Sequence, residues 1–597
     1  MRRAHATVPA LAAATVVALR YNPVYDPDAF WHLATGRWIV AHRAIPAVDS
    51  FSHTALGRPL RFVDALADTI LYGAWSLGGY GALALLTGAL GALAVAIALR
   101  HKRFDASLAV AAPLVSALIF RVTPRPQTFA LPCFAALLAA LDAARADRRW
   151  LRAAPVILAV WQNLHPSAPL GLGAVGLAAL GETWRHRGRD ELRAAVTPWW
   201  VTVALSALAL LLTHRPLDRL AAGFAHVSDV NMAELITEWA PLLRFDAAAP
   251  YAYGFYALLA LSLAGLWAMR REGALRVEVA LLGAITTAQA FHAVRFVPFA
   301  AIALAPVALE GARGLLDLAP SRARAALAAA FAVALGTVAV LPLRHGWGAG
   351  VNPEQMPVGA ARFLASQPTE GKMLNEFTFG GYLLWTLDAR HPVFLDGRSM
   401  ALYEPRFVDA ALRARAPALQ GFLTQYDIGV IVHRTSSLLT WAESIPGWSL
   451  VYFDDTAFVA VRDADHAALA RDRGYRALHP GDWARVVAEL RRDPSRVPAA
   501  RAELARALRD APRSSLARVL AGAVRLGEGD HPGAERAFLD ASRLRPESVP
   551  PWRGLLMSCV LRRDARCVCL RARQVLARSP RNAYALDAAR RARCAPP

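Results

Sequence analysis

The sequence predicts a multi-pass α-helical membrane protein with an α/β domain and a helical repeat tail outside the membrane. Apolar spans of about 15 to 20 residues recur from Ala10 to Leu341, and this length crosses roughly 30 Å of hydrocarbon as a helix. Short apolar runs then alternate with helical patterns, and finally prolines recur every 34 residues. We therefore expect a membrane domain at 1–345, a soluble α/β domain at 346–462 and a helical repeat domain at 463–597.

The composition supports a membrane location and argues against a nucleic-acid partner. The chain has 597 residues, 55% of them hydrophobic, and its mean hydropathy of +0.30 is too high for a soluble protein. A net charge of +21 would indicate nucleic acid in a soluble chain. Here much of the arginine lies in short loops between apolar spans, which is the positive-inside pattern of membrane proteins. The excess of arginine over lysine is typical of a GC-rich bacterial coding bias, so we expect a bacterial inner membrane.

The apolar spans predict about eleven transmembrane helices. Ala10–Leu19 is expected to be an uncleaved first helix that starts in the cytoplasm, with an outer loop at 21–63 after it. Asp64–Tyr80 is expected to be an amphipathic interfacial helix, and Gly81–Leu99 the return span. Further spans lie near 106–120, 128–143, 153–163, 169–184, 195–213, 254–269, 276–291, 296–312 and 325–342. An odd number of helices places everything after His345 outside, in the periplasm or beyond; a miscount by one would place it in the cytoplasm.

The first outer loop carries the densest set of side chains capable of catalysis in the first half of the chain. Asp26 followed by Pro27 predicts a helix start, because the carboxylate can cap free N–H groups and proline suits the first helical position. Asp28 then lies in the first turn, where the positive end of the helix keeps it ionised, and His32 follows four residues later on the same face. The alternative is that Asp26 is only a cap and His32 only an interfacial polar residue.

Four other outer stretches carry polar groups at the ends of apolar spans. Ionisable groups at membrane depth are costly and mark a pathway or a site. The alternative for each one is an interfacial side chain that reaches toward water. The candidates are Arg125, Asn163, His165, Glu238 and Arg295.

The pattern after His345 predicts an α/β domain. A helix is expected at Pro357–Ser366 and others near 379–388 and 405–425. Strands are expected at Lys372–Phe377, Pro392–Leu395, Ile428–His433, Trp448–Phe453 and Ala457–Val461, with Asp454-Asp455 as a hairpin turn between the last two.

Three polar clusters punctuate this domain, and each has two interpretations. They are predicted either to make tight turns at strand ends or to form a rim over the membrane site. The rim candidates are Asn375, Glu376, Tyr382, Asp396 and Arg398.

The last part of the chain has the period of tetratricopeptide repeats. Pro512, Pro546 and Pro580 are spaced by 34 residues, and each follows a helical pattern. Such units stack into an interaction surface, which predicts a protein partner.

Four cysteines crowd the final repeat: Cys559, Cys567, Cys569 and Cys594. If the tail lies in an oxidising compartment, a disulfide across the last helical hairpin is expected, although four cysteines allow three complete pairings. Metal binding is less favoured, because the spacing lacks paired C-x-x-C motifs. Cys133 lies inside an apolar span and is expected to be inert.

Two motifs carry a resemblance to a known group of proteins. The first is DPDAFWHLATG in the outer loop, and the second is NEFTFGGYLLW with FLDGR after the membrane region. Over roughly residues 1–460 the chain resembles the membrane glycosyltransferases of the GT-C fold, which include protein O-mannosyltransferases, lipid A aminoarabinose transferases and catalytic oligosaccharyltransferase subunits. It is most similar to bacterial proteins with D-x-D-x-W-W-H-L-x-x-G followed by N-E-x-x-x-G-G-Y-L-x-W and F-x-D-G-R, which are predicted glycosyltransferases.

The resemblance implies a sugar donor linked through phosphate to a polyprenyl lipid, and transfer on the outer face of the membrane. By position, Asp28 is the expected general base, with His32 beside it and Asp26 as its neighbour. In one branch the acidic residues hold a metal, so Asp26 and Asp28 are also candidates for binding Mg²⁺ or Mn²⁺.

The same resemblance assigns Arg295 and Arg125 to the leaving phosphate, with His165 and Glu238 as further pocket residues. The chain departs from the family in two places. Ala29 follows Asp28 where relatives have an Asp-Glu pair, which weakens the assignment of Asp28, and there is no WWDYG motif, so transfer of a whole oligosaccharide to asparagine is not expected.

Two other functions fit parts of the sequence. A non-catalytic envelope scaffold would use the repeat tail to recruit partners and would tolerate replacement of Asp28. A transporter of lipid-linked substrates would show internal repeats among its membrane helices and broken polar helices at the midplane. The sequence shows no such repeats, and most polar groups fall at the outer ends of the spans.

Overall fold

The computed structural model divides the chain into two compact units. It describes residues 2–60, 63–100, 103–188, 190–225, 237–244, 250–320, scattered positions between 322 and 336, 347–398 and 402–594. The membrane unit comprises Met1–Asp49, Gly57–Val351 and Met400–Glu404, and the C-terminal unit comprises Ser50–Leu56, Asn352–Ser399 and Pro405–Pro597. A short piece of the first loop therefore belongs to the C-terminal unit. The α/β part and the helical tail share that unit, and the division into three domains stays a prediction.

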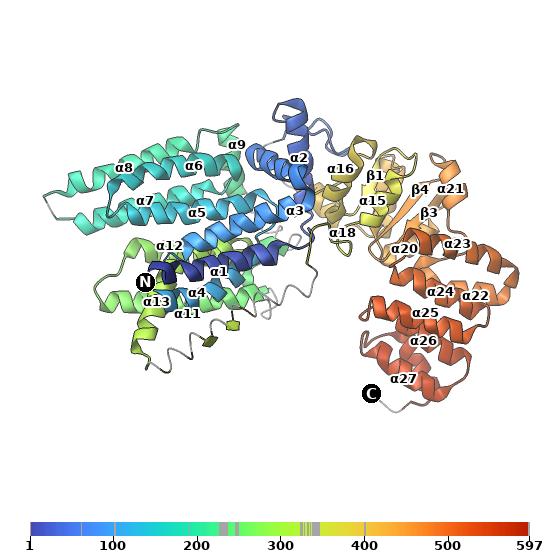
Figure 1. The fold of residues 1–597 in the computed structure, drawn as a ribbon. Helices are drawn as coiled ribbons and strands as arrows, with labels where there is room; N and C mark the ends of the chain where they lie inside the picture. The colour runs from blue at the N-terminus through green and yellow to red at the C-terminus, as the bar shows by residue number, and fades with distance from the viewer. Residues whose placement is uncertain are drawn as a thin grey trace. The chain divides into compact units, whose positions relative to one another are not determined.

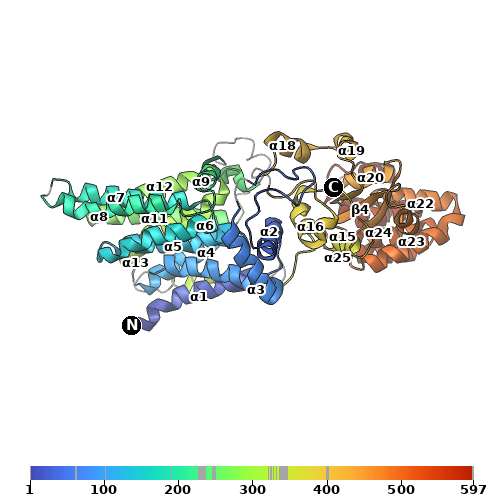
Figure 2. The same cartoon turned by 90° about the horizontal axis from the view of Figure 1, so that it is seen from above.

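The described part of the membrane unit is a bundle of α-helices (Figures 1 and 2). Some of the connections between the helices contain a short 3₁₀ turn. Its helices are α1 (Arg2–Arg20), α2 (Asp28–His42), α3 (Ala65–Ala98), α4 (Phe104–Ile119), α5 (Pro126–Ala143), α6 (Ala153–Leu164), α7 (Ala168–His186), α8 (Leu192–Ala209), α9 (Pro216–Ala225), α11 (Pro250–Arg271), α12 (Val277–His292) and α13 (Val297–Leu318). The 3₁₀ turns are η1 (Arg148–Arg152), η2 (Thr237–Trp239), η3 (Leu242–Arg244) and η4 (Val294–Phe296). The predicted spans up to residue 312 all fall on these helices. The last one, at 325–342, lies largely outside the described residues.

Five of the described helices are long and apolar enough to cross a membrane. They are Ala65–Ala98, Pro126–Ala143, Leu192–Ala209, Tyr251–Arg271 and Val294–Leu318, and two shorter apolar helices span Thr7–Arg20 and Phe104–Ile119. The chain is therefore a multi-pass membrane protein, as the sequence predicts. The number of eleven crossings stays a prediction.

Helix α3 is broken where the sequence predicts a change from an interfacial helix to a span. Gly78 and Gly79 have non-helical backbone angles, and Gly79 has φ +58°, a conformation that glycine adopts without steric cost. The interfacial position of the first half stays a prediction.

Small residues bring the last two long helices of the bundle together. A Cβ atom added at Gly311 of α13 would clash with the Leu261 carbonyl oxygen of α11, and one added at Gly265 would clash with the Val307 oxygen. Small residues at helix crossings let backbones approach closely in membranes. This contact fixes α13, and with it the η4 turn at its N-terminal end.

The C-terminal unit contains a four-stranded mixed sheet in the order β1-β2-β4-β3. Its strands are β1 (Met373–Asn375), β2 (Val430–Arg434), β3 (Trp448–Phe453) and β4 (Ala457–Arg462). β1 pairs with β2 in parallel, and β4 is antiparallel to both β2 and β3. The neighbouring helices are α15 (Val358–Ala365), α16 (Gly380–Leu387), α18 (Pro405–Arg413), α19 (Ala416–Gln425) and α20 (Ser437–Ser444), and the short turns are η6 (Phe377–Phe379) and η7 (Asp388–Arg390). Four of the five predicted strands are confirmed.

The fifth predicted strand, Pro392–Leu395, is wrong. The Asn375 side chain replaces a strand ladder there: its Oδ1 accepts from the Phe394 N–H at 2.7 Å, and its Nδ2 donates to the Leu395 oxygen at 2.7 Å. Val393 makes only an isolated bridge, to Ser52 of the first loop. The apolar run is buried by its neighbours without becoming a strand of the sheet.

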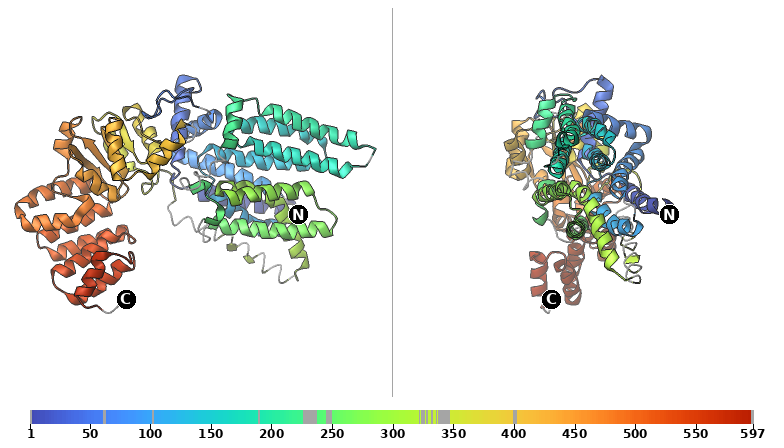
Figure 3. Two further views of the ribbon diagram at one scale, coloured as in Figure 1. Left: turned by 180° about the vertical axis from the view of Figure 1, so that it is seen from behind. Right: turned by 90° about the vertical axis from the view of Figure 1, so that its left-hand side faces the viewer.

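The tail consists of paired helices with a regular period (Figure 3). They are α21 (Ala467–Arg473), α22 (Trp483–Arg492), α23 (Val497–Asp510), α24 (Ser515–Gly527), α25 (His531–Leu544), α26 (Val549–Leu561), α27 (Ala565–Leu576) and α28 (Ala583–Arg591), with turns η8 (Pro480–Asp482) and η9 (Pro494–Arg496). Helices α23, α25 and α27 start 34 residues apart, and so do α24, α26 and α28. Their assignment as tetratricopeptide repeats stays a prediction.

Two disulfides close the end of the tail. Cys559 of α26 is bonded to Cys567 of α27, and Cys569 is bonded to Cys594 after α28. The predicted disulfide across the last helical hairpin is present, and the structure selects this pairing among the three.

Candidate functional site

Arg125 lies at the centre of a cluster of charged side chains in the membrane unit. It precedes Pro126 at the start of α5, in extended backbone that turns its side chain away from the helix. Its guanidinium is paired with the Asp28 carboxylate and lies 3.6 Å from Asp26 Oδ2 and 2.9 Å from Glu238 Oε2. One cation therefore joins the first outer loop to the loop that precedes α11.

Glu238 gathers two further arginines. Its carboxylate is 2.8 Å from Arg121 Nη2 and 3.4 Å from Arg295 Nη1. The Arg295 guanidinium also lies 4.1 Å from the centre of the Trp239 ring, a cation–π contact. Gln127 of α5 accepts from Arg121 and donates to the Arg295 carbonyl oxygen, which fixes both arginines.

We call these six side chains the arginine cluster: Arg121, Arg125, Arg295, Asp26, Asp28 and Glu238. Three cations face three carboxylates, and their side chains are only 9% to 18% exposed. Burial alone would raise the pKa of Glu238, but the Arg121, Arg125 and Arg295 guanidiniums hold that pKa well below its usual range. Burial alone would lower the pKa of Arg125, and Asp26 and Glu238 raise it instead. Glu238 and Arg125 are therefore charged at neutral pH.

The start of α2 holds two members of the cluster in place. The helix begins at Asp28, and Asp26 Oδ1 accepts from the Asp28 N–H at 3.1 Å. Asp26 therefore accepts from an N–H of the first turn, as predicted, but the cap position is Pro27, one residue after the predicted one. Asp28 lies in the first turn, as predicted, with its carboxylate near the positive end of the helix.

His32 lies four residues after Asp28 but has different partners. Its Nδ1 is 2.6 Å from Asp68 Oδ1 of α3, and both side chains are buried. Asp64, one turn before Asp68, is paired with Arg219 at 2.8 Å. Burial lowers the pKa of His32 to about 4, although Asp64 and Asp26 act in the opposite direction. His32 is therefore neutral at pH 7.

His165 and Asn163 lie at the end of α6 and differ in their surroundings. The ring of His165 bonds to the Ser167 hydroxyl at 2.8 Å, and its pKa is lowered well below the usual value by burial and by the positive charges of Arg295 and Arg219. It therefore lies within the field of the arginine cluster. Asn163 donates to the carbonyl oxygens of Ala159 and Leu212, which ties α6 to the chain after α8. The structure does not bring Asn163 into contact with the cluster.

A pocket opens on the other side of Asp26. It is a small pocket between the end of α1, the second half of α3 and the chain before α5. Its lining includes Arg20, Asn22, Tyr25, Asp26, Thr87 and Thr123. Arg20 is nine-tenths buried and donates to the Tyr25 hydroxyl at 2.9 Å. The pocket offers a small polar group access to the Asp26 side of the first loop.

The predicted rim residues hold the C-terminal unit together. Asn375 joins β1 to Leu395, and Glu376 accepts from the Phe379 N–H at the start of η6. Asp396 and Arg398 are buried and bonded to each other, with 2.6 Å between Oδ2 and Nη2. Tyr382 is buried in α16. Glu376 follows β1 at a strand end, as the turn interpretation predicts, but Asp396 follows no strand of the sheet, and a role over the membrane site stays a prediction.

Sequence reasoning selected Arg125, Glu238 and Arg295 but missed Arg121, Asp68 and Arg219. Arg121 lies in the same RVTPRPQ stretch as Arg125, one turn of chain earlier, so its proximity was a usable signal. Asp68 and Arg219 are separated from their partners by 36 and 155 residues, and nothing local to them indicates a pairing.

The carboxylates of the first loop do not fit a divalent metal. One cation, Arg125, already neutralises Asp28 and approaches Asp26, whose Oδ1 is used by the helix start. Within the described ranges no three His, Cys, Asp or Glu side chains converge as a metal-binding group. The donor set is thus poorer than the several oxygen ligands that Mg²⁺ or Mn²⁺ requires.

Comparisons with known proteins give a match in structure alone. No family model matches the chain, and no curated protein matches it in sequence. Among solved structures it is similar to the archaeal oligosaccharyltransferase AglB from Archaeoglobus fulgidus in complex with an inhibitory peptide and a dolichol-phosphate, with 13% identity, 77% of this chain and 74% of that chain covered, and a TM-score of 0.51. A match to ArnT from Cupriavidus metallidurans bound to undecaprenyl phosphate has 15% identity, 78% and 98% coverage, and a TM-score of 0.43. The likeness to AglB shows the predicted GT-C fold, while the helix count and the tetratricopeptide assignment of the tail stay predictions.

Proposed function

We propose that this GT-C membrane protein is a glycosyltransferase that moves a sugar from a polyprenyl-phosphate donor to an acceptor. The observation that carries the proposal is the position of Arg125, which is shared by Asp28 and Glu238 within a neutral, mostly buried cluster. The fold supports it, because the similar oligosaccharyltransferase was solved with a dolichol-phosphate. Fold alone does not fix a reaction, so the chemistry of the cluster has to support it as well.

The three arginines of the cluster are suited to the phosphate of the donor. Guanidinium groups bind phosphate oxygens through paired, charge-assisted hydrogen bonds. The negative charge that develops on a leaving phosphate is stabilised by cations already held in place. Arg125 and Arg295, which approach Glu238 from two sides, are the proposed contacts, and Arg121 is added to the residues that the sequence indicated.

Binding of phosphate at Arg125 also changes the state of Asp28. In the structure Asp28 is neutralised by Arg125, so its carboxylate is a weak base. A donor phosphate competes for the same guanidinium and releases the carboxylate. The base is thus activated only when the donor is present.

The proposed transfer step is a displacement at the anomeric carbon. Asp28 takes the proton of the acceptor hydroxyl as its oxygen attacks, because a hydroxyl is a poor nucleophile until that proton is removed. The new bond joins acceptor oxygen to anomeric carbon, and the broken bond is the one from that carbon to the phosphate oxygen. The electron pair of the broken bond leaves with the polyprenyl phosphate, and the arginines stabilise the negative charge on that phosphate.

The two histidines are proposed to bind the substrates as neutral groups. His32 and His165 both have lowered pKa values and are neutral at pH 7. Their Nδ1 atoms are bonded to Asp68 and Ser167, so each ring offers a substrate only its Nε2 atom, as a donor or an acceptor according to the tautomer. Asp68 fixes the orientation of the His32 ring. Such groups can bond sugar or acceptor hydroxyls without adding charge to the site.

The proposed location is the outer face of a bacterial cytoplasmic membrane, with the C-terminal unit outside. The two disulfides at the end of the tail agree with an oxidising compartment, since such bonds are rare in the cytosol. A protein partner for the tail remains part of this proposal.

The test is transfer of radiolabelled sugar from a panel of polyprenyl-phosphate donors in membranes that contain equal amounts of each variant. We expect Asp28→Asn to lower transfer by at least about 100-fold, the range for loss of a general base. Asp142→Asn is the matched control, because Asp142 also pairs with arginines but lies at the end of α5, away from the cluster. Equal transfer by Asp28→Asn and wild type would refute the role of Asp28, and transfer by neither chain would favour a scaffold.

A further inference from the structure

The last two helices of the tail carry an unusual excess of positive charge. Residues 562–593, which we call the terminal basic region, contain ten arginines and two aspartates. They cover α27 and α28 and the turns around them. Arginine is abundant throughout this chain, so the number of arginines alone indicates no function; what distinguishes this region is how few carboxylates accompany them.

Upstream in the tail, several arginines are paired with carboxylates, although Arg491, Arg492, Arg509, Arg513 and Arg536 have no ion pair or side-chain hydrogen bond within the described residues. Arg473 lies 2.7 Å from Asp510, Arg501 lies 2.7 Å from Glu528, and Arg485 lies 2.6 Å from Glu489. Residues 467–548, which cover the tail helices before α26, contain 16 arginines and 11 acidic residues, so carboxylates offset most of their charge.

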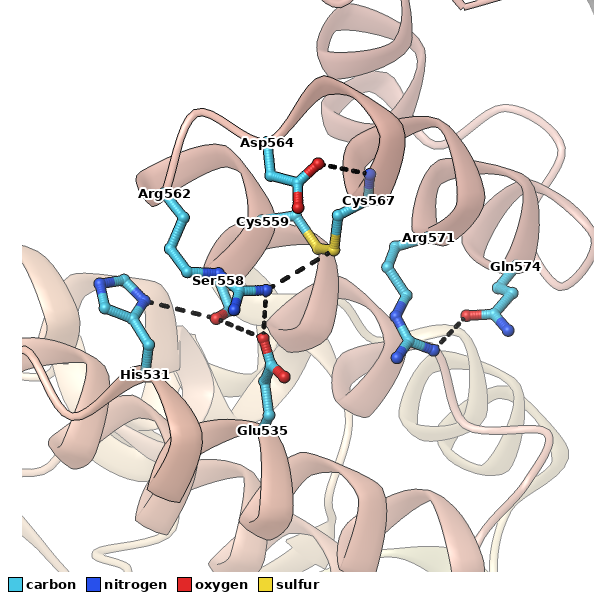
Figure 4. The surroundings of a disulfide bond; sticks show 9 residues. All are labelled: His531, Glu535, Ser558, Cys559, Arg562, Asp564, Cys567, Arg571 and Gln574. Atoms are coloured by element: carbon cyan, nitrogen blue, oxygen red, sulfur yellow. Dashed lines mark hydrogen bonds and ion pairs between the residues drawn. A yellow bond between two sulfur atoms is a disulfide. The ribbon is translucent and has the colours of Figure 1, made fainter.

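Five of the ten arginines of the terminal basic region lack such partners. Arg562 is bound by Glu535 and Arg571 by Gln574, as Figure 4 shows beside the Cys559–Cys567 disulfide. Arg578 lies over the Trp552 ring, and Asp587 pairs with Arg591 and, at 4.0 Å, with Arg590. The others have no ion pair or side-chain hydrogen bond within the described residues: Arg563, Arg566, Arg573, Arg581 and Arg593. All five side chains are exposed.

Exposed leucines lie between these arginines. Arg566, Leu570 and Arg573 are spaced four and three residues apart, which places them on one face of α27. Leu586 and Arg590 have the same relation on α28. Leu570 is 56% exposed and Leu586 is 41% exposed, so both helices present an apolar side chain to solvent beside cations.

We propose that the terminal basic region binds the surface of a membrane that contains anionic phospholipids. Cationic residues near such a surface are attracted by its negative potential, and apolar side chains between them enter the boundary of the acyl chains. A soluble polyanion would explain the arginines but gives no reason for exposed leucines on the same face. This inference is independent of the proposed reaction.

The disulfides make this surface a rigid one. Cys559–Cys567 ties α27 to α26, and Cys569–Cys594 ties α27 to the chain after α28. The arginines of both helices therefore keep their relative positions, so less conformational entropy is lost when they bind together.

The test uses the full chain in nanodiscs of phosphatidylcholine and measures its flotation with added vesicles. We expect flotation with vesicles that contain phosphatidylglycerol, and release by high salt because the attraction is screened. The double variant Arg566→Gln/Arg573→Gln should weaken binding by roughly 25-fold, about fivefold for each arginine. Leu570→Ser should weaken it further without changing the charge.

The matched control is Arg485→Gln/Arg501→Gln, which removes the same charge from paired arginines of α22 and α23. Binding by this control should equal that of the wild type. An equal loss in both double variants would overturn the proposal, because total charge would then be responsible. So would flotation that is unaffected by Leu570→Ser, which would assign the surface to a soluble polyanion, or equal binding to vesicles of phosphatidylcholine alone.

Discussion

Arginine is used in two opposite ways in this molecule. In the arginine cluster of the membrane unit, three arginines face three carboxylates and are mostly buried. In the terminal basic region, ten arginines face two aspartates and most are exposed. Burying a charge is costly unless it is paired, whereas water stabilises an unpaired charge at the surface. The number of carboxylates beside the arginines therefore distinguishes the internal cluster from the proposed docking surface, although both are rich in arginine.

This comparison predicts the largest effect where a buried charge loses its partner. Glu238→Gln would leave Arg121, Arg125 and Arg295 with two carboxylates, and should destabilise the membrane unit by about 3–5 kcal/mol. Thermal unfolding in detergent measures this loss. Glu272→Gln, which removes the exposed partner of Arg313, is the control and should change stability by less than about 1 kcal/mol. Similar unfolding of both variants would show that burial does not distinguish them.

The second effect concerns the rigidity of the terminal basic region. The Cys569–Cys594 disulfide closes a loop with a sequence separation of 25, and its removal by Cys569→Ser/Cys594→Ser should cost about 3–4 kcal/mol in the tail. Denaturant unfolding of the full chain, followed by tryptophan fluorescence, reports this as an earlier transition of the tail. An unchanged transition would mean that packing of α28 suffices without the bond.

The third effect is a pH dependence in the membrane unit. His32 has a folded pKa of about 4, below its ordinary value of 6.5, so the unfolded chain takes up a proton first as the pH falls. Stability should therefore decrease between pH 6.5 and about 4, by up to roughly 3 kcal/mol. His32→Gln should flatten this part of the profile of melting temperature against pH. A profile with the same slope in both proteins would assign the titration to another group.

The smallest effect is expected for the exposed arginines. Arg573→Gln has no ion pair to lose within the described residues and should change stability by less than about 0.5 kcal/mol. The same denaturant unfolding measures it. A larger destabilisation would mean that the terminal basic region contributes to the fold of the tail rather than to docking.

The sequence predicted those features that depend on local pattern. Asp26 before Pro27 marked the start of α2 within one residue, Gly78 and Gly79 fell at the predicted break, and the 34-residue spacing of prolines matched the starts of the tail helices. Each of these depends on residues within one or two turns of chain.

What the sequence could not provide were contacts between distant residues. Arg125 and Glu238 are 113 residues apart, and only the packed bundle shows that they share an ion pair. Pro392–Leu395 has the apolar pattern of a strand, but the Asn375 side chain takes the place of its ladder partner. The spacing of the four cysteines allowed three pairings, and helix packing decided between them.

The most direct test of the central claim is a double-mutant cycle on the rate of sugar transfer. If Arg125 passes from Asp28 to the donor phosphate, the two residues act as one unit and their effects are not additive. We expect Asp28→Asn/Arg125→Gln to transfer sugar at nearly the rate of the slower single variant. Losses that multiply in the double variant would contradict the coupling of donor binding to activation of the base.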